Sequence, residues 1–313
     1  FLIETCEESG SFDLPPYLEA LSEKLGNPDL VVVLDSGGPD YEHIWVTEAL
    51  RGLVSGNLSV RVSHEGVHSG MSGGTIPSSF RIQRMLLDRV EDSVTGKVLI
   101  PEMHVDISDK VHEEATALAE LLGNGIWDQL PVVDNLLPQH SGTKEILLDM
   151  NWRPAMAVIG ADGIPPSQTA GNVLRTNTDL KLSFRIPPGV DAATVDELVK
   201  QRLEENPPYG AEVIYAQDAA ADGFHAPPMQ GKVSEALAEA SQHISGLPPM
   251  ATWIGGTIPF MAMMQNKYPN TSFLCTGTGG PGNNAHGSDE KLHIPSSKRL
   301  TAVLAATVAA VSQ

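Results

Sequence analysis

The arrangement of apolar and polar residues changes twice along the chain. Leu30 to Leu34 forms an unbroken apolar run that ends at Asp35, which is typical of a strand buried on both faces of an α/β sheet. Leu58 to Ser63 and residues 180–186 instead alternate, which predicts strands with one face in water. Residues 226–313 return to the first pattern. The chain is therefore expected to contain an α/β domain in two segments, 1–56 and 225–313, with a small α+β sandwich of residues 57–224 inserted between them.

Helices are expected where apolar residues recur at helical spacing. These segments are residues 16–25, 78–90, 110–122, 192–203, 233–244 and 297–311. Asp191 is expected to cap the fourth of them. Short strands are expected at residues 1–3, at 211–215, near 252 and at 272–275, whereas residues 95–170 are otherwise irregular and punctuated by proline.

Composition and charge exclude several classes of protein. The 313 residues include 20 Lys and Arg against 39 Asp and Glu, a net charge of −19, so nucleic acid and anionic membrane surfaces are not expected as partners. No run approaches the roughly 18 apolar residues that span a bilayer. The two cysteines, Cys6 and Cys275, exclude a disulfide framework and a cysteine-rich zinc module.

Three polar segments could carry chemistry. Glu7 and Glu8 follow an apolar segment, Asp35 ends the run of residues 30–34, and His286 lies in a loop rich in Gly and Asn. Carboxylates at the carboxyl ends of strands and a lone imidazole suit a metal site in an α/β sheet. Each feature taken singly is more typical of a solvated turn, a cap or a surface loop.

Taken together and in order, these segments resemble the dinuclear metallopeptidases that include carnosinase, cytosolic non-specific dipeptidase, aminoacylase, succinyl-diaminopimelate desuccinylase and carboxypeptidase G. The resemblance also covers residues 49–52, 67–70 with 73–77, 152–154, 172–173, 183–187 and 255–259, which is nearly the whole chain. The long stretch before Trp152 looks like the carnosinase and dipeptidase branch. The resemblance implies a zinc-exopeptidase-like, three-layer α/β/α catalytic domain with an inserted lid and dimerisation domain.

The resemblance also implies roles for the metal-site residues. Glu7 matches the general base that activates a water between two metals, and Glu8 matches a carboxylate ligand of one metal. Asp35 matches a ligand of the other metal, and His286 matches the imidazole that shares a metal with Glu8. Two divalent ions are implied, zinc first and manganese or cobalt as alternatives.

Further residues match the family's substrate contacts. His68 is similar to a lid histidine that reaches into the partner subunit's site and stabilises the oxyanion, and Asn172 is expected near it. Arg185, Gly256 and Thr257 match groups that hold the substrate's terminal carboxylate, a task suited to a bidentate guanidinium.

The chain also departs from the family pattern. The His-x-Asp pair and the bridging Asp that precede the Glu-Glu motif in the family have no counterpart here, so we expect the chain to be the C-terminal part of a longer one. With three of five ligands, this chain is not expected to assemble the paired-metal site by itself. His104 and Asp106 have the right local spacing, but they follow the Glu-Glu motif and are interpreted as a surface segment.

The resemblance implies a metallo-dipeptidase that is homodimeric through the lid, with the strand Leu58 to Ser63 extending a sheet between subunits, and a cytoplasmic location. Two alternatives stay open: an N-acyl amino acid amidohydrolase of the aminoacylase or desuccinylase type, and a non-catalytic fragment that serves as a dimerisation module.

Overall fold

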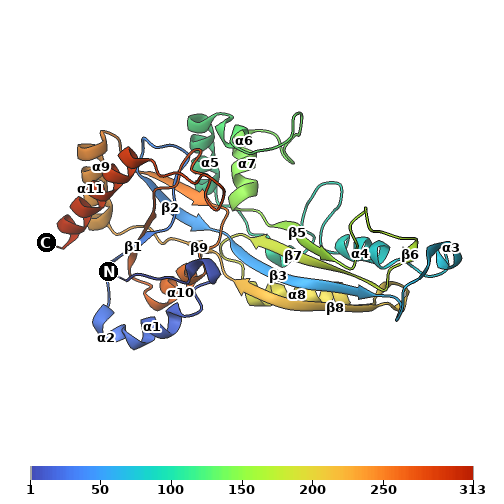
Figure 1. Cartoon of the computed structure of the whole chain (residues 1–313). Helices are drawn as coiled ribbons and strands as arrows, with labels where there is room; N and C mark the ends of the chain where they lie inside the picture. Colours follow the sequence, from blue (N-terminus) through green and yellow to red (C-terminus); the bar gives the residue numbers. More distant parts are fainter. Residues whose placement is uncertain (1, 313) are drawn as a thin grey trace. The chain divides into compact units, whose positions relative to one another are not determined.

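The computed structural model describes residues 2–312, which divide into two compact units (Figure 1). Unit 1 comprises Phe1–Arg51, Ile107–Asn151 and Gly223–Gln313, and unit 2 comprises Gly52–Asp106 and Trp152–Asp222. An insertion between two outer segments was expected. The expected continuous lid of residues 57–224 differs from this division, because residues 107–151 group with unit 1.

The packing of α7 (Thr143–Asn151) explains this difference. This helix contacts α5 (Asp109–Leu122) and β10 (Met250–Ile254), both in unit 1. The Nη1 of Arg51 also donates to the carbonyl of Asp149, at 3.3 Å. These contacts join residues far apart in the sequence, so the local pattern did not reveal them.

Unit 1 is built on parallel strand pairs. β1 (Leu30–Leu34) pairs with β11 (Ser272–Thr276), and β10 pairs with β2 (Trp45–Leu50). β9 (Phe224–His225) adds an antiparallel neighbour to β2. The remaining elements of the unit are the 3-10 helix η1 (Glu7–Ser9) and the helices α1 (Leu14–Ala20), α2 (Ser22–Leu25), α6 (Gly125–Asp128), α9 (Gly231–Ser245), α10 (Pro259–Lys267) and α11 (Ile294–Val311).

Helices cover both faces of these strands. Leu274 of β11 packs in one core with α9 and α11, whereas its neighbours Phe273 and Cys275 pack in another with α1 and α10. Successive side chains of a strand point to opposite faces, so one strand serves both cores. Unit 1 therefore has the expected three layers, with α9 and α11 side by side in one of them (Figure 1).

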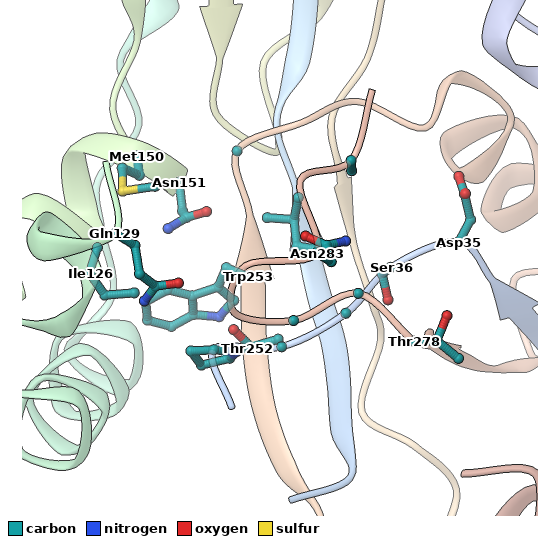
Figure 2. A pocket seen from close by; sticks show the side chains of 18 of the residues that line it. Asp35, Ser36, Ile126, Gln129, Met150, Asn151, Thr252, Trp253, Thr278 and Asn283 are labelled. Carbon is teal, nitrogen blue, oxygen red and sulfur yellow. The ribbon is translucent and has the colours of Figure 1, made fainter. Parts of the chain in front are cut away.

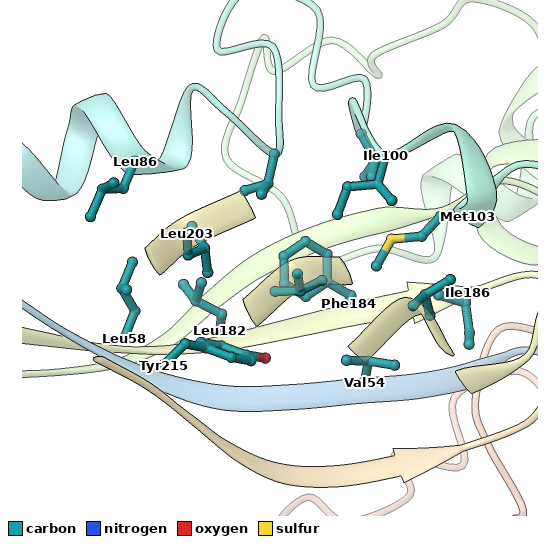
Figure 3. Packing of buried hydrophobic residues seen from close by; sticks show 14 of the residues in the cluster. Val54, Leu58, Leu86, Ile100, Met103, Leu182, Phe184, Ile186, Leu203 and Tyr215 are labelled. Atoms are coloured by element: carbon teal, nitrogen blue, oxygen red, sulfur yellow. The ribbon is translucent and has the colours of Figure 1, made fainter. Parts of the chain in front are cut away.

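Unit 2 is a two-layer sandwich. Its sheet has the order β5-β7-β3-β8, formed by Ala155–Asp162, Asn177–Ile186, Gly52–Arg61 and Glu212–Ala221. Helices α4 (Ser79–Leu87) and α8 (Ala192–Glu204) pack on one face. Val54, Leu182 and Phe184 are fully buried in this core (Figure 3). The unit also contains α3 (Ser69–Ser72), η2 (Pro101–Met103), η3 (Pro208–Gly210) and the small pair β4 (Val67–His68) and β6 (Val173–Leu174).

Most expected elements are confirmed, including the cap at Asp191, whose carboxylate accepts from the amide of Thr194 at 2.6 Å. The strand expected at residues 1–3 is wrong over its described part, because Ile3 is 87% exposed and no strand pairs with it; Phe1 lies outside the described residues. β1 packs on both faces as expected, with Val31 and Val33 in one core and Leu30 and Val32 against the other, and only its last residue, Leu34, is 64% exposed. β2, β5, α7 and α10 were not predicted.

The expected role of residues 58–63 in extending a sheet between subunits is also wrong. These residues fall largely in β3, which is hydrogen-bonded to β7 on one side and β8 on the other. Both hydrogen-bonding edges of β3 are therefore occupied, and the edges of this sheet are β5 and β8.

Within residues 2–312, no helix is both long enough and apolar enough to cross a membrane.

Candidate active site

The Glu7-Glu8 pair lies on a tight turn. Both residues belong to η1, which ends at Gly10 with a φ of 98°. Glycine adopts this left-handed backbone without the steric cost that other residues incur. The carbonyl of Cys6 accepts from the amide of Ser9 at 3.1 Å, which closes the turn. The turn leaves Glu7 half-buried and Glu8 exposed.

Asp35 follows β1 at the carboxyl end of the β1–β11 pair. Beyond the strands the two loops stay in contact, because Gly37 forms a parallel bridge with Gly279. A Cβ atom on Gly277 would lie 1.8 Å from the carbonyl oxygen of Ser36. Only glycine allows this approach. The loop that carries Asp35 and the loop that leads to His286 are thus held together by their backbones.

The base of the His286 loop is held by Tyr41. The Tyr41 hydroxyl donates to the carbonyl of Pro281 at 3.1 Å. A Cβ on Gly280 would lie 2.3 Å from the Tyr41 ring, and the ring centroid is 4.2 Å from that of His293. From this base the loop presents His286 with its side chain 75% exposed.

The predicted base and metal ligands influence one another. The Nδ1 of His286 lies 3.8 Å from the Oε2 of Glu8. Partial desolvation, followed by the charges of Asp35 and Glu8, raises the pKa of the Glu7 carboxyl. Partial desolvation, followed by the charge of Glu8, likewise raises the pKa of Asp35. His286 opposes both shifts. The fold therefore gathers three distant segments into one acidic cluster with a single imidazole.

A cavity of about 1070 Å³ adjoins this cluster. Glu8, Asp35 and His286 line it, and Glu7 does not. Its other wall comes from α5, α6, α7 and β10. Figure 2 shows Asp35 on one side and Ile126 on the other.

The side chains of this cluster are of the chemical types that bind divalent cations. Carboxylate and imidazole are ordinary ligands of zinc and related ions, and Glu8 and His286 are close enough to share one. Desolvation and then the charge of Glu8 raise the pKa of Asp35, and a bound cation would offset the repulsion from Glu8. Between residues 2 and 312, however, no group of three or more His, Cys, Asp or Glu side chains is arranged to hold a metal.

His68 and Asn172 lie together in unit 2. The amide of Ser69, next to His68, donates to the carbonyl of Asn172 at 3.0 Å, so the expected proximity is confirmed. His68 also caps α3, and its Nδ1 accepts from the amide of Gly70 at 3.1 Å. A neutral imidazole that accepts at Nδ1 carries its proton on Nε2. The Nε2–H of this exposed side chain is thus available as a donor.

The proposed carboxylate-binding residues are divided between the units. Arg185 lies half-buried on β7 of unit 2, and burial lowers the pKa of its guanidinium. Gly256 and Thr257 belong to unit 1, where the Thr257 hydroxyl donates to the carbonyl of Arg51 at 2.7 Å. Neither residue lines the cavity, although the adjacent Gly255 does.

His104 and Asp106 are both exposed, and the His104 ring nitrogen Nε2 lies 2.8 Å from the carbonyl oxygen of Val98. This local contact supports their interpretation as a surface segment.

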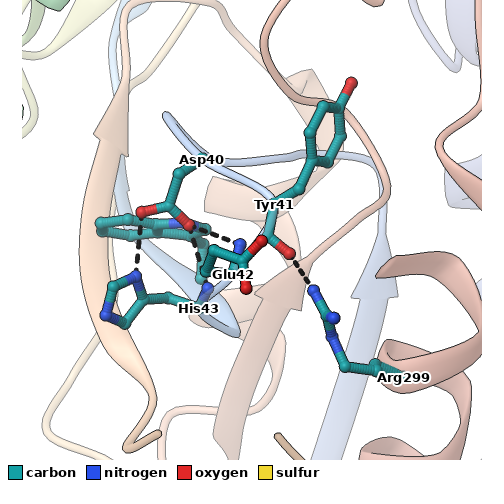
Figure 4. A network of polar contacts seen from close by, with 6 residues as sticks. Asp40, Tyr41, Glu42, His43 and Arg299 are labelled. Atoms are coloured by element: carbon teal, nitrogen blue, oxygen red, sulfur yellow. Dashed lines mark hydrogen bonds and ion pairs between the residues drawn. The ribbon is translucent and has the colours of Figure 1, made fainter. Parts of the chain in front are cut away.

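The structure adds a polar network that sequence reasoning missed. The carboxylate of Asp40 accepts from the amides of Glu42 and His43, the His43 ring and the Trp45 indole, at 2.8 to 3.1 Å (Figure 4). The network fixes the turn that carries Tyr41. An acidic residue next to such a turn was the only signal in the sequence, and it is too common to be informative.

Comparison with known proteins agrees with the earlier resemblance. Residues 1–310 match the family described as Peptidase family M20/M25/M40. The chain is similar to the cysteinylglycine-S-conjugate dipeptidase of Corynebacterium striatum, with 24% identity over 300 residues that cover 93% of this chain and 62% of that protein. It is also similar to the Beta-Ala-His dipeptidase of Homo sapiens, with 22% identity over 308 residues that cover 94% and 58%. The chain spans about three-fifths of the length of these relatives.

A solved structure shows the same fold. The di-peptidase Dug1p of Saccharomyces cerevisiae superposes with a TM-score of 0.79 and 23% identity, covering 98% of this chain and 64% of that one. Both the α/β architecture and the inserted sandwich therefore have a precedent.

The Asp40 network predicts an acid-sensitive contribution to stability. Desolvation raises the pKa of Asp40, but the hydrogen bonds from His43, Glu42 and Trp45 together lower it below its ordinary value. A lowered pKa stabilises the fold above about pH 4, the unfolded value, and this contribution is lost as pH falls through the folded pKa. Asp40→Asn should lower the free energy of unfolding by about 1–2 kcal/mol at pH 7. In urea denaturation at a series of pH values, this variant should also lose less of its free energy of unfolding as the pH falls. Asp134→Asn, in an exposed loop, is the control. If the free energy of unfolding falls equally with decreasing pH in Asp40→Asn and in the unsubstituted protein, this role is contradicted.

Proposed function

The chain belongs to the peptidase family M20/M25/M40, and on this premise we propose that it is a metal-dependent hydrolase that cleaves the amide bond of dipeptides or short peptides. The observation that carries the proposal is the gathering of Glu7, Glu8, Asp35 and His286 beside one large cavity. The relatives named as dipeptidases support dipeptides as the substrate class.

Two divalent ions, zinc first, are proposed at the acidic cluster. Glu8 and His286 would hold one ion, and Asp35 would contribute to the other. When bound, such ions lower the pKa of a water molecule and polarise a carbonyl group. The name metallodipeptidase, given to a relative in Schizosaccharomyces pombe, supports a metal-dependent reaction.

Glu7 is proposed as the general base. It takes a proton from the attacking water and delivers it to the leaving amine, which a positioned carboxylate can do in both directions. Its half-buried place next to Glu8, at the cluster but outside the ligand set, supports this role.

Glu7→Gln, made in the full-length enzyme, tests the proposed activity. The substitution keeps the size of the side chain and removes the proton acceptor, so kcat for a dipeptide should fall at least about a hundredfold. Metal content, measured by mass spectrometry of the metal-loaded protein, should not change. Glu23→Gln, on the exposed surface of α2, should retain full activity. A near-normal rate in Glu7→Gln would rule out Glu7 as the general base.

Arg185 is proposed to bind the terminal carboxylate of the substrate, with Asn172, Gly256 and Thr257 as further contacts. A planar guanidinium donates two parallel hydrogen bonds to a carboxylate. The half-buried setting of Arg185 strengthens such bonds, since competing water is reduced.

Arg185→Lys should therefore reduce kcat/KM by at least about tenfold although the charge is kept, because the fork geometry is lost. A dipeptide amide should be a poor substrate of the unsubstituted enzyme for the same reason. Arg175→Lys, at an exposed position of unit 2, controls for general effects. Equal turnover of a dipeptide and its amide would rule out the carboxylate contact.

A homodimer through unit 2 is proposed, with His68 of each chain acting in the partner's site. The Nε2–H of His68 is free of the Nδ1 cap contact and could stabilise an oxyanion. The edge strands β5 and β8 carry exposed apolar side chains, among them Ile159 and Ile214, and such edges favour pairing with another chain.

Light scattering at micromolar concentration should give twice the 33.4 kDa chain mass. Mixing inactive His68→Ala with inactive Glu7→Gln should restore part of the activity through mixed dimers, because one site then has both groups. Two Glu7→Gln preparations mixed together should stay inactive. A monomeric mass would refute the dimer.

A further inference from the structure

The connection between β1 and β2 touches two segments of the proposed metal site. Asp35, a proposed ligand, begins this connection of residues 35–44, and Tyr41 lies in its middle. Tyr41 contacts the loop of residues 277–293, which carries His286, a second proposed ligand. One short connection therefore carries one ligand and contacts the loop of another.

The Tyr41 side chain contacts both ends of the His286 loop. At the end that enters the loop, its hydroxyl donates to the carbonyl of Pro281 at 3.1 Å, and a Cβ on Gly280 would lie 2.3 Å from its ring. At the end that leaves the loop, the His293 ring centroid is 4.2 Å from that of Tyr41. The half-buried ring thus joins the two ends, and we call these three contacts the Tyr41 clamp.

The backbone of Tyr41 is itself fixed from two sides. The carboxylate of Asp40 accepts from the amides of Glu42 and His43, at 2.8 and 2.9 Å. Arg299 of α11 donates to the carbonyl of Tyr41 (Figure 4). Because its backbone is already ordered, Tyr41 can hold a second segment with little further loss of conformational entropy.

Backbone hydrogen bonds connect the clamped ends to His286. The amide of Lys291 donates to the carbonyl of Asn283 at 2.8 Å, which joins the two sides of the loop a second time. The amide of Gly287 donates to the carbonyl of Asn284 at 2.9 Å and closes the turn that contains His286. The loop is thus closed on itself, so a movement of its ends carries His286 along.

The position of the His286 imidazole depends on this loop. The side chain is 75% exposed, and its Nδ1 lies 3.8 Å from the Oε2 of Glu8, which is longer than a hydrogen bond. Glu8 therefore does not hold the ring by a hydrogen bond. The backbone of the loop places the imidazole next to Glu8.

We propose that Tyr41 is a positioning residue of the metal site: its clamp holds the His286 loop and so places the imidazole beside Glu8. The inference rests on the proposed function and deepens it, because Tyr41 acts on the metal through His286 rather than by contact. Substitution of a residue that orients a metal ligand typically changes metal affinity by about 10- to 100-fold. The hydroxyl and the ring of Tyr41 are expected to contribute separately, since they contact different residues.

Hydrogen exchange, followed by mass spectrometry of the full-length enzyme without added metal, tests the clamp. Exchange of residues 280–293 should be at least about tenfold faster in Tyr41→Ala, because the hydrogen bond and the ring contacts are both lost. Tyr41→Phe keeps the ring and should give a smaller increase, of about threefold. Tyr17→Ala, at a position of α1 that is 62% exposed, should leave the exchange of this loop unchanged. If Tyr41→Ala does not fold, Tyr41→Phe still tests the hydrogen bond.

Zinc titration tests whether the clamp acts on the metal site. The Kd of zinc, measured by calorimetry on the full-length enzyme, should rise at least about tenfold in Tyr41→Ala. Saturating zinc should restore kcat for a dipeptide to within about threefold and leave KM unchanged, because Tyr41 does not line the cavity. In a His286→Ala background, Tyr41→Ala should have no further effect on the Kd, since the two residues act in series.

These measurements separate the clamp from the proposed activity. Weaker zinc binding and faster exchange in Tyr41→Ala, in an enzyme that hydrolyses no dipeptide, would support the inference and count against the hydrolase. Unchanged exchange of residues 280–293 in both Tyr41 variants would overturn the clamp. An unchanged zinc Kd in Tyr41→Ala, or the same loss of affinity in the His286→Ala background, would overturn its action through His286.

Discussion

The arrangement of the site depends on one backbone contact, between the loops that follow β1 and β11. These strands are parallel, so their carboxyl ends meet at the same edge. Gly37 and Gly277 lie so close to the other loop that added Cβ atoms would fall 2.2 and 1.8 Å from carbonyl oxygens. Any side chain at either position would force the loops apart. Asp35 begins one loop and His286 lies further along the other, so their separation is set by these glycines.

Electrostatics then distinguishes the two halves of the cavity. The acidic cluster lies in a chain of net charge −19, and partial desolvation together with the charge of Glu8 raises the pKa values of Glu7 and Asp35. Such a cluster has a strong tendency to bind cations. The wall from residues 118–151 and β10 contributes no charge. A charged side and an uncharged side therefore adjoin within one cavity.

Local sequence patterns were sufficient for most elements and for the main candidates of the site. An unbroken apolar run located β1, whereas hydrophobic periodicity located β7 and α8, because each of these buries a face that repeats at the period of a strand or a helix. The motifs around Glu7, Asp35 and His286 could be recognised in the sequence because glycine-rich turns and strand ends restrict which residues can follow. The resemblance to a peptidase family rested on their order and was confirmed by the family match.

Only the tertiary structure decided which segments meet. The sequence of residues 58–63 indicated a strand, but hydrogen bonds on both sides of β3 place it inside the sheet rather than at an edge. Residues 107–151 lie in the middle of the expected lid, yet they pack in unit 1 and supply Asn151 to the cavity wall. A hydrophobic pattern records that a face is buried and not which partner buries it. Pairing and packing join residues distant along the chain, and the sequence taken locally does not encode those partners.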